Sequence, residues 1–354
     1  MTQANVRPVQ AAKLRGFVSK VLQAYETPPA DADFVAEILV EADLRGVDSH
    51  GVTRLSGYVG MLDRGYINPL PTIKVVSEDA ACTVLEGDLA FGMLVARKGM
   101  EMSLQRAKEH GMGMTISRNM THTGLVGYYT MTAASQGFIG IAMNNGPVIV
   151  PPYGSITPLY ATNPMSVAFP ADKEEPIVLD MATSMVAAGK LRLVEKTGNR
   201  VPMDWGVDRH GKPTDDPTEI LQHGYLQWAG GYKGFGLATM IETLTAVLSG
   251  GLFGRQSPTL KHFGQDPLMQ SGAYIAIDIS RFMPLEMFKG RVDELVRMIN
   301  DSEPADGHER VYVSGAPEFA FKRERVANGI PMPTPVYEEL RALGERFSVP
   351  LDLD

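Results

Sequence analysis

The periodicity of the apolar residues changes near residue 72, and this change constrains the fold more than any other feature of the chain. Residues 8–24 and 30–46 carry apolar side chains at helical spacing, and a Pro-Pro pair separates them. The same spacing predicts a third helix that begins at Ser49 or His50 and ends near residue 65. From residue 73 onward, short β-rich runs interrupt the helical pattern. We therefore expect a small helical unit followed by a larger region of mixed structure.

The rest of the chain alternates β-rich runs with helical segments. The β-rich runs predict strands at residues 73–76, 82–87, 112–117, 138–143, 166–169 and 176–180. Helical spacing predicts helices at residues 92–110, 124–136, 234–248, 284–299 and 336–347. Two weakly patterned stretches, 192–225 and 252–272, are predicted to be surface loops. The expected fold class is α/β (α+β).

The composition argues against several classes of partner. The chain has 354 residues, of which 44% are hydrophobic and 21% charged, as is ordinary for a soluble protein with a large core. Its formal net charge of -8 disfavours nucleic acid and anionic membranes, which require basic surfaces. Its single cysteine, Cys82, excludes an internal disulfide and fits a reducing compartment. Since there is neither a signal-peptide core nor a membrane-length apolar run, we expect a cytoplasmic protein with a small-molecule or protein partner.

The segment Asp48-Ser49-His50-Gly51-Val52-Thr53-Arg54 concentrates chemically active side chains. His50 and Arg54 are four positions apart, so a helix would place them on one face. An imidazole exchanges a proton near neutral pH, and a guanidinium can hold a carboxylate through two hydrogen bonds. The pair therefore suits a substrate that has a carboxylate beside a carbonyl, hydroxyl or imine carbon. Ser49 would orient or polarise the imidazole.

This segment also has two alternative interpretations. Ser49 could cap the N-terminus of the third helix, which is a purely structural role. A serine-hydrolase triad would also use Ser, His and Asp, but here the three residues are consecutive and the chain has no Gly-x-Ser-x-Gly turn. The sequence does not decide whether Ser49 has this capping role, but it argues against a hydrolase triad.

Three later segments have the composition of binding-site turns. The segment from Asn119 to Gly124 opens a predicted helix, whose free amides could bind a phosphate, and its His122 is a second acid/base candidate. A predicted strand ends at Asp180, and small residues then run to Gly189-Lys190. Lys233 lies at the start of another predicted helix, where a bound phosphate would offset its unfavourable interaction with the helix dipole.

Two common kinds of site are not expected. Neither Gly-x-Gly-x-x-Gly nor Gly-x-x-x-x-Gly-Lys-Ser/Thr occurs, so a bound dinucleotide would not use the usual Rossmann fingerprint. The seven histidines are scattered, with no His-x-x-x-His pair and no close carboxylate cluster. We therefore expect no metal.

Together, these segments resemble the type-2 malate/L-lactate dehydrogenase family, which also includes ureidoglycolate and sulfolactate dehydrogenases, diketogulonate reductase and reductases of cyclic imino acids. The resemblance covers nearly the whole chain. The similar segments, in the family's order and approximate spacing, are Asp48 to Arg54, Asn119 to Gly124, Ala161-Thr162-Asn163-Pro164, Leu179 to Ser184 with Gly189-Lys190, and Gly231-Tyr232-Lys233-Gly234-Phe235-Gly236-Leu237.

The resemblance implies a fold, a cofactor and an assembly. Such proteins transfer hydride with NAD or NADP on a non-Rossmann fold with a mixed or antiparallel sheet, usually as homodimers. It implies a helical unit at residues 1–72 that carries the proton donor and a nicotinamide-binding α/β domain at 73–280. A C-terminal helical segment at 281–354 would pack back on the first unit.

The resemblance also implies roles for single residues. His50 would donate or accept the proton with help from Ser49, Arg54 would bind the substrate carboxylate, and Thr162 would lie near the substrate. Some members are assigned a catalytic histidine at the position of His122, so this role stays open. The residues expected to contact the dinucleotide are His122, Thr123, Gly124, Leu125, Val126, Leu179, Asp180, Met181 and Lys233.

The chain departs from the family near its C-terminus. Members usually carry Pro-Gly-Glu about thirteen positions before a Gly-Ile pair, and the corresponding residues are Ser314-Gly315-Ala316. We expect this loop to contact the cofactor, but without the glutamate. Lys322, Arg323 and Arg325 follow and could favour a 2'-phosphate, although we prefer to interpret them as a solvated basic helix face.

The predicted function is hydride transfer between a nicotinamide and C2 of a small 2-oxo or 2-hydroxy acid. The alternative within this chemistry is reduction of a C=N bond in a cyclic or N-alkyl imino acid. An alternative of another class is a non-catalytic binding protein on the same scaffold, against which the intact set of Ser49, His50 and Arg54 argues.

Overall fold

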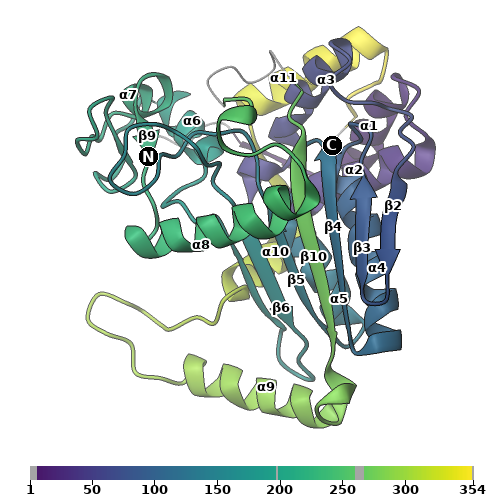
Figure 1. Ribbon diagram of the computed structural model, residues 1–354. Helices are drawn as coiled ribbons and strands as arrows, with labels where there is room; N and C mark the ends of the chain where they lie inside the picture. Colours follow the sequence, from purple (N-terminus) through teal and green to yellow (C-terminus); the bar gives the residue numbers. More distant parts are fainter. Residues whose placement is uncertain (1–5, 197, 260–266, 353–354) are drawn as a thin grey trace.

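A seven-stranded mixed β-sheet forms the centre of the protein (Figure 1). The computed structural model describes residues 6–196, 198–259 and 267–352. The strand order is β2-β3-β4-β10-β5-β6-β7; β3 and β4 run parallel, and the other neighbouring pairs in this sheet run antiparallel. The strands are β2 (Lys74–Asp79), β3 (Cys82–Glu86), β4 (Met112–Met120), β5 (Phe138–Asn144), β6 (Met165–Phe169), β7 (Ile177–Met181) and β10 (Gln270–Asp278).

Helices cover both faces of this sheet. On one face, α4 (Gly92–His110) packs against β4 and β10, and α5 (Val126–Ser135) packs against β5 and β6. On the other face, α8 (Tyr232–Glu242) and its π-helical continuation (Thr243–Val247) cross in front of the sheet in Figure 1. The close approach of α4 requires a glycine, because a Cβ on Gly99 would come within 2.3 Å of the Tyr274 ring. The central strands are therefore buried between two helical layers.

The N-terminal helices form a separate layer at one end of the sheet. They are α1 (Ala11–Gln23), α2 (Pro29–Leu44) and α3 (Leu55–Asp63); two 3-10 turns, Asp48–His50 and Val52–Arg54, connect α2 to α3. Residues 11–23 and 29–44 bury apolar faces that include Leu14, Ile38 and Leu39. Proline occupies the first position of α2, where its missing N–H has no cost.

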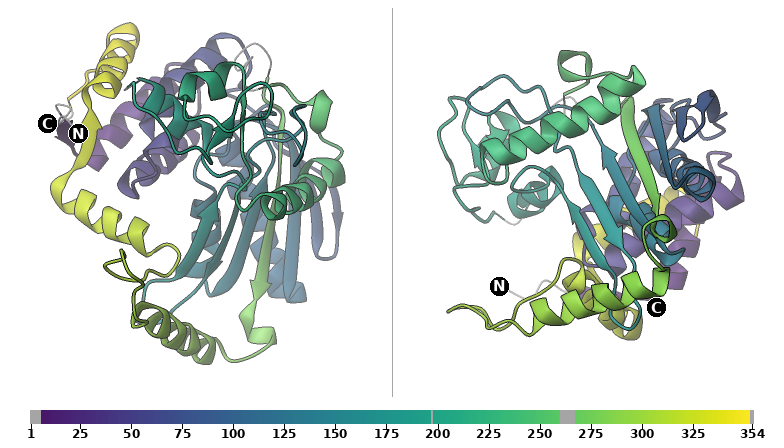
Figure 2. Two further views of the ribbon diagram at one scale, coloured as in Figure 1. Left: turned by 90° about the vertical axis from the view of Figure 1, so that its left-hand side faces the viewer. Right: turned by 60° about the horizontal axis from the view of Figure 1, so that its bottom comes forward.

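The C-terminal segment divides between two places (Figure 2). α10 (Ala316–Asn328) packs on α2, and α11 (Thr334–Phe347) packs on α1 and α3. β11 (Ile330–Pro333) pairs with β1 (Val6–Val9), so the two ends of the described chain share a small antiparallel sheet. α9 (Leu285–Asn300) instead lies at the other end of the large sheet, away from the N-terminal helices.

A smaller hydrophobic core lies beside the large sheet. It gathers buried side chains from distant parts of the chain: Ile149, Val150, Val186, Leu191, Val201, Ile220, Leu226, Trp228 and Ala238. The elements around it are α6 (Ala188–Lys196), α7 (Pro217–Gln222), β8 (Gly206–Val207) and β9 (Tyr225–Leu226). This core holds α6 at the edge of the cavity described below.

The predicted fold class, a mixed α/β fold with a mixed sheet, is confirmed. The surface-loop prediction for residues 192–225 is wrong, because apolar side chains from this stretch enter the smaller core. The loop prediction for 252–272 is wrong at its end, since β10 begins at Gln270; residues 260–266 of that prediction lie outside the described residues. The strand was missed because both of its faces are buried, so polar and apolar residues do not alternate along it.

The predicted start of the third helix is also wrong. Two 3-10 turns occupy residues 48–54, and α3 begins only at Leu55. Gly51, between the turns, has an extended ψ of -153° that interrupts helical geometry. Ser49 makes no capping hydrogen bond, so the structural-cap interpretation is excluded.

Candidate active site

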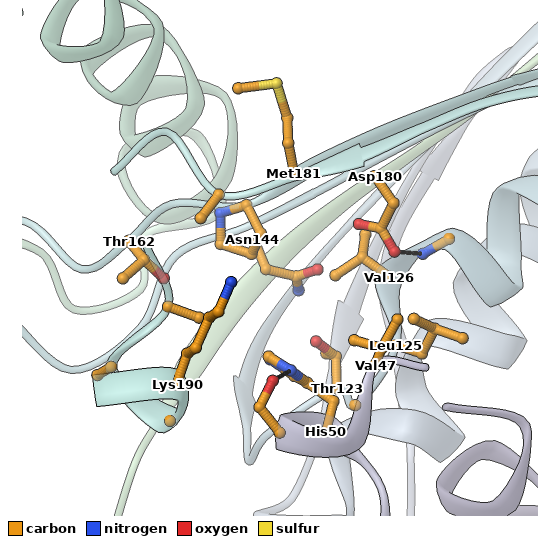
Figure 3. Close-up of a pocket in the computed structure, with 18 of the residues that line it drawn as sticks. Val47, His50, Thr123, Leu125, Val126, Asn144, Thr162, Asp180, Met181 and Lys190 are labelled. Carbon is orange, nitrogen blue, oxygen red and sulfur yellow. Dashed lines mark hydrogen bonds between the residues drawn. The ribbon is translucent and has the colours of Figure 1, made fainter. Parts of the chain in front are cut away.

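A cavity of about 960 Å³ lies where the N-terminal helical layer meets the sheet and the smaller core. Its walls come from the 3-10 turns, the β4–α5 connection, the end of β7, the start of α6 and the start of α10. Figure 3 shows His50 and Thr123 on one side of this space, Lys190 and Thr162 on another, and Asp180 beyond them. Segments that are far apart in the sequence therefore converge on one space.

Asp43, a buried residue of α2, supports the turn that carries His50. The Asp43 carboxylate accepts a hydrogen bond of 2.9 Å from the Val52 amide. It packs so closely under Gly51 that a Cβ there would lie 1.7 Å from Asp43 Oδ1. Burial raises the pKa of Asp43 well above its ordinary value, and the Val52 amide and nearby Arg325 only partly oppose this. Glycine is thus required at position 51 by contact with the carboxylate.

Arg325 of α10 also binds this turn. Its guanidinium donates to the Asp48 carboxylate at 2.5 Å and also to the backbone carbonyl of Asp43. Helix α10 therefore fixes the position of the 48–54 segment.

Ser49, His50 and Arg54 form a connected group on the cavity wall. Ser49 Oγ lies 2.9 Å from Nδ1 of His50, which leaves Nε2 as the other titratable position of the ring. Arg54 Nε donates to the Ser49 carbonyl at 2.6 Å, so its two terminal nitrogens extend beyond this anchor. A serine hydroxyl can donate or accept, and His50 can therefore keep this hydrogen bond whether its imidazole is neutral or protonated.

His122 lies beside His50 but has different partners. The two rings stack with their centroids 5.5 Å apart and their planes inclined by 25°. The Gly124 amide donates to Nδ1 of His122 at 3.3 Å, and the Tyr58 hydroxyl lies 2.7 Å from the same nitrogen. Because an amide can only donate, Nδ1 is an acceptor and the ring proton resides on Nε2. Protonating Nδ1 would place its N–H against the Gly124 N–H.

The surroundings of both imidazoles favour their neutral forms. Desolvation and, secondarily, the Arg54 cation lower the pKa of His50 to about 3. The same two causes, together with His50, lower the pKa of His122 well below its ordinary value. The Arg54 contribution depends on the charge of that guanidinium. A carboxylate bound to Arg54 would offset it and make His50 easier to protonate.

Asp180, at the end of β7, lies across the cavity from His50 (Figure 3). Its Oδ2 accepts a hydrogen bond of 2.8 Å from the Gly127 amide in the first turn of α5. Desolvation raises the pKa of Asp180 to about 6, and the neighbouring Glu318 carboxylate adds to this rise, while the Gly127 amide and the Arg45 guanidinium oppose it. Glu318 and Arg45 also line the cavity. Two carboxylates therefore lie together on this side of the cavity, with Arg45 nearby.

The turn that carries Thr162 is anchored underneath by a polar network. Asn163, with a φ of +34°, donates to Glu242 Oε2 at 2.8 Å and to the Ala238 carbonyl at 2.9 Å. The Thr162 carbonyl accepts hydrogen bonds from the amide and hydroxyl of Thr183. Thr162 itself lines the cavity, where the sequence predicts a substrate neighbour.

The structure brings most of the predicted site residues together. Around the cavity lie Ser49, His50, Arg54, His122, Thr123, Gly124, Leu125, Val126, Thr162, Leu179, Asp180, Met181, Ser314 and Gly315. Ala316 and Lys233 are not among the lining residues; Lys233 is exposed in the first turn of α8, four residues beyond Ala229, which does line the cavity.

The loop that departs from the family pattern enters the cavity without a glutamate at Ala316. Gly315 has a φ of +93°, and a Cβ there would lie 3.0 Å from Val178, so the approach of the loop to β7 requires glycine. Two positions after Ala316, Glu318 brings a carboxylate to the cavity from the first turn of α10. The cavity therefore has a carboxylate at Glu318, although Ala316 stands where the family usually has a glutamate.

The three basic residues of α10 form ion pairs with other elements. Lys322 pairs with Glu41 at 2.8 Å, Arg323 with Glu175 at 2.6 Å and Arg325 with Asp48. The interpretation as a solvated basic face is therefore wrong for Arg325, whose side chain is 12% exposed. None of the three lines the cavity, as far as the described residues define it.

Sequence reasoning missed several polar cavity residues, among them Arg45, Tyr58, Asn144, Asn145, Arg192, Gln270, Tyr312 and Glu318. Tyr58 falls at helical spacing among apolar residues, which is typical of core packing. Arg192 belongs to a stretch that was expected to be a loop. Within the described parts of the chain, no group of three or more His, Cys, Asp or Glu side chains is placed to hold a metal ion.

Comparisons with known proteins identify the family of this chain. The family model described as malate/L-lactate dehydrogenase matches residues 9–341. A malate dehydrogenase of Pyrococcus abyssi is 37% identical over 95% of this chain and 94% of its own. An L-sulfolactate dehydrogenase of Methanocaldococcus jannaschii is 36% identical over 96% of each chain. The crystal structure of malate dehydrogenase from Entamoeba histolytica superposes with a TM-score of 0.94 and 30% identity, over 98% of this chain and 100% of its own.

The fold and the site thus define an oxidoreductase of the non-Rossmann class that acts on hydroxy and oxo acids. The chain belongs to the malate/L-lactate dehydrogenase family and is an enzyme. Among the described helices, none has the length and apolar character needed to cross a bilayer.

Proposed function

We propose that this enzyme interconverts a small 2-hydroxy carboxylate and the corresponding 2-oxo acid, using a nicotinamide dinucleotide. The observation that carries the proposal is the placement of His50 and Arg54 on one cavity wall, with the Ser49 hydroxyl on the histidine ring and the Ser49 carbonyl on the arginine. The malate and sulfolactate dehydrogenases among its relatives support this substrate class.

The cavity fits such a cofactor. Its volume lies at the upper end of the range of about 300–1,000 Å³ typical of small-molecule sites. Leu125, Val126, Leu179 and Met181 provide an apolar wall for flat rings. Asp180, exposed in the cavity, can accept hydrogen bonds from ribose hydroxyls. When bound, the nicotinamide would accept hydride from C2 of the hydroxy acid or return it to the oxo acid.

The protein supplies proton transfer and orientation. In oxidation, neutral His50 takes the hydroxyl proton as the C2–H electron pair leaves as hydride; in reduction, protonated His50 gives that proton to the new alkoxide. Arg54 holds the substrate carboxylate and so determines which face of C2 is presented. His122, whose Nδ1 accepts from the Gly124 amide, donates from Nε2 and helps to hold the substrate oxygen.

The cofactor-contacting residues that we propose are His122, Thr123, Gly124, Leu125, Val126, Leu179, Asp180, Met181, Ser314 and Gly315, with Ala316 and Lys233 outside the cavity lining. The two carboxylates, Asp180 and Glu318, favour NAD over NADP, because a 2'-phosphate near them would be repelled. The family resemblance implies a homodimer, and the composition of the sequence predicts a cytoplasmic location.

A panel assay tests this function. Oxidation of NADH and of NADPH would be followed with pyruvate-like 2-oxo acids, with cyclic imines, and with pyruvate plus methylamine. We expect turnover of a 2-oxo acid and a lower KM for NADH. Turnover of imines alone would replace the substrate class. If neither NADH nor NADPH binds in fluorescence titrations, the assignment of this cavity to a nicotinamide dinucleotide is refuted.

A further inference from the structure

Helix α10 packs on the end of α2, directly before the turn that carries His50. The Phe321 ring of α10 lies against Gly46, where φ is +76° and a Cβ would come within 2.9 Å of Phe321 Cδ2. Gly46 is therefore required by its left-handed conformation and by this close contact. Lys322, the next residue of α10, pairs with Glu41 of α2 at 2.8 Å. Apolar and charged contacts with α10 thus hold the end of α2 in place.

Arg325, one turn after Phe321, connects α10 to the 3-10 turn itself. Its guanidinium donates to both oxygens of the Asp48 carboxylate, at 2.5 and 3.5 Å, and to the backbone carbonyl of Asp43. The same Asp43 carbonyl accepts from the Gly46 amide at 3.1 Å, so Arg325 binds both the last turn of α2 and the first residue of the 3-10 turn. A planar guanidinium with several partners fixes an orientation that a single hydrogen bond does not fix.

The position of Asp48 sets the position of His50. Asp48 is the first residue of the 3-10 turn, two positions before His50, and its carbonyl accepts from the Gly51 amide at 3.2 Å. Because the turn is short and hydrogen-bonded within itself, a displacement of Asp48 would carry Ser49 and His50 with it. Arg325 is not among the described residues that line the cavity, so it acts on this geometry from outside.

The ion pair of Arg325 with Asp48 should matter more for geometry than for stability. The Asp48 side chain is 53% exposed, and ion pairs that water reaches contribute little to the free energy of unfolding. The rate of proton transfer, in contrast, depends steeply on the placement of the acid/base. Loss of the pair is therefore expected to change the placement of the turn more than the folding of the protein.

We propose that Arg325 is a positioning residue for proton transfer. By binding Asp48 and the Asp43 carbonyl, it holds the turn that carries His50 where the imidazole can reach the substrate oxygen. This inference rests on the proposed function, because the proton transfer is part of that proposal. Another role that the charge of Arg325 permits is the binding of a cofactor phosphate, and the experiment separates the two.

Arg325→Met and Arg325→Lys would be compared with Arg323→Met. Methionine removes the donors but keeps an unbranched side chain, and lysine keeps the charge without the planar fork. The control removes the same charge from an exposed residue of the same helix, which pairs with Glu175. The measurements are kcat for reduction of pyruvate and of oxaloacetate, and the Kd of NADH by fluorescence.

The expected result is a loss of kcat without a loss of cofactor affinity. Arg325→Met should lower kcat about 10- to 100-fold, since a misplacement of about 1 Å can cost about 10²-fold in rate. Arg325→Lys should regain part of this loss. The Kd of NADH should remain near that of wild type in all three variants, and Arg323→Met should keep the wild-type kcat.

Hydrogen exchange gives a readout that does not depend on turnover. The peptide that covers residues 44–55 should exchange faster in Arg325→Met than in wild type, while the strand at residues 112–120 should not change. Asp48→Asn weakens the same pair from its other side and should reproduce the faster exchange and the loss of kcat. If Arg325 acts through Asp48, the double variant should lose less than the sum of the two single losses.

Other outcomes overturn the inference. Unchanged exchange of residues 44–55 in Arg325→Met would do so, as would an equal loss of kcat in Arg323→Met. A higher Kd of NADH as the main effect would assign Arg325 to a cofactor phosphate. If the wild type turns over no 2-oxo acid, the proposed function fails, and exchange alone decides whether Arg325 positions the turn. If Arg325→Met does not fold, Arg325→Lys and Asp48→Asn are judged by the same two readouts.

Discussion

The assignment of the acid/base can be tested by replacing each of the two stacked histidines with glutamine. His50→Gln keeps a polar side chain beside Ser49 but removes the titratable nitrogen. General acid/base catalysis typically contributes about 10²- to 10⁴-fold, which corresponds to about 3–5 kcal/mol of barrier at 1.36 kcal/mol per decade. We therefore expect kcat to fall by at least about 10²-fold, with the Kd of NADH nearly unchanged.

The hydrogen bonds indicate why His122→Gln should be milder. A glutamine carbonyl can still accept from the Gly124 amide and the Tyr58 hydroxyl, so the neutral role of His122 is largely retained. We expect a loss of about tenfold or less, as for one neutral hydrogen bond of about 1 kcal/mol. His223→Gln, at an exposed position outside the cavity lining, is the matched control.

The pH dependence gives the test a second readout. Because desolvation and the Arg54 cation lower the pKa of His50 to about 3, its imidazole is neutral at pH 7 before a substrate carboxylate binds Arg54. Oxidation needs the neutral ring and should hold its rate down to mildly acid pH, whereas reduction should slow as pH rises above the pKa of the substrate complex. Both dependences should disappear in His50→Gln. A nearly full rate in His50→Gln together with a collapse in His122→Gln would refute the assignment.

Three further predictions concern the support of the site. Gly51→Ala should destabilise the protein by about 2 kcal/mol or more, as overpacking does, because its Cβ would meet Asp43 Oδ1; an unchanged urea midpoint would contradict that contact. Asp43→Asn keeps an acceptor for the Val52 amide. Because the native pKa of Asp43 is raised, wild-type stability is lost as pH rises from about 4 toward that native pKa, so the Tm of the variant should rise relative to that of the wild type over this range. Parallel Tm curves would contradict a raised pKa at Asp43. Lys233→Met should raise the Kd of the cofactor several-fold if the bound dinucleotide reaches past Ala229 to the first turn of α8, and equal NADH titration curves would remove Lys233 from the site.

Local spacing in the sequence determined most of the helices and strands. The 92–110 helix was predicted with the bounds that the structure shows, because its apolar face and terminal glycine are local signals. Residue chemistry likewise singled out His50, Arg54, His122 and Asp180, which the fold places around one cavity. These features could be predicted because each depends on neighbours within a few turns of chain.

Only the tertiary structure decided how these residues are arranged. The 48–54 segment is a pair of 3-10 turns rather than a helix because residues of other helices bind it. The Asp43 carboxylate of α2 accepts from the Val52 amide, and the Arg325 guanidinium of α10 donates to the Asp48 carboxylate. Arg192 enters the cavity because residues 201–228 form a core beneath α6, and Glu318 enters because α10 packs on α2. The sequence by itself determined which chemistry was available, while long-range packing decided the distances, partners and charges around His50 and His122 on which their proposed roles depend.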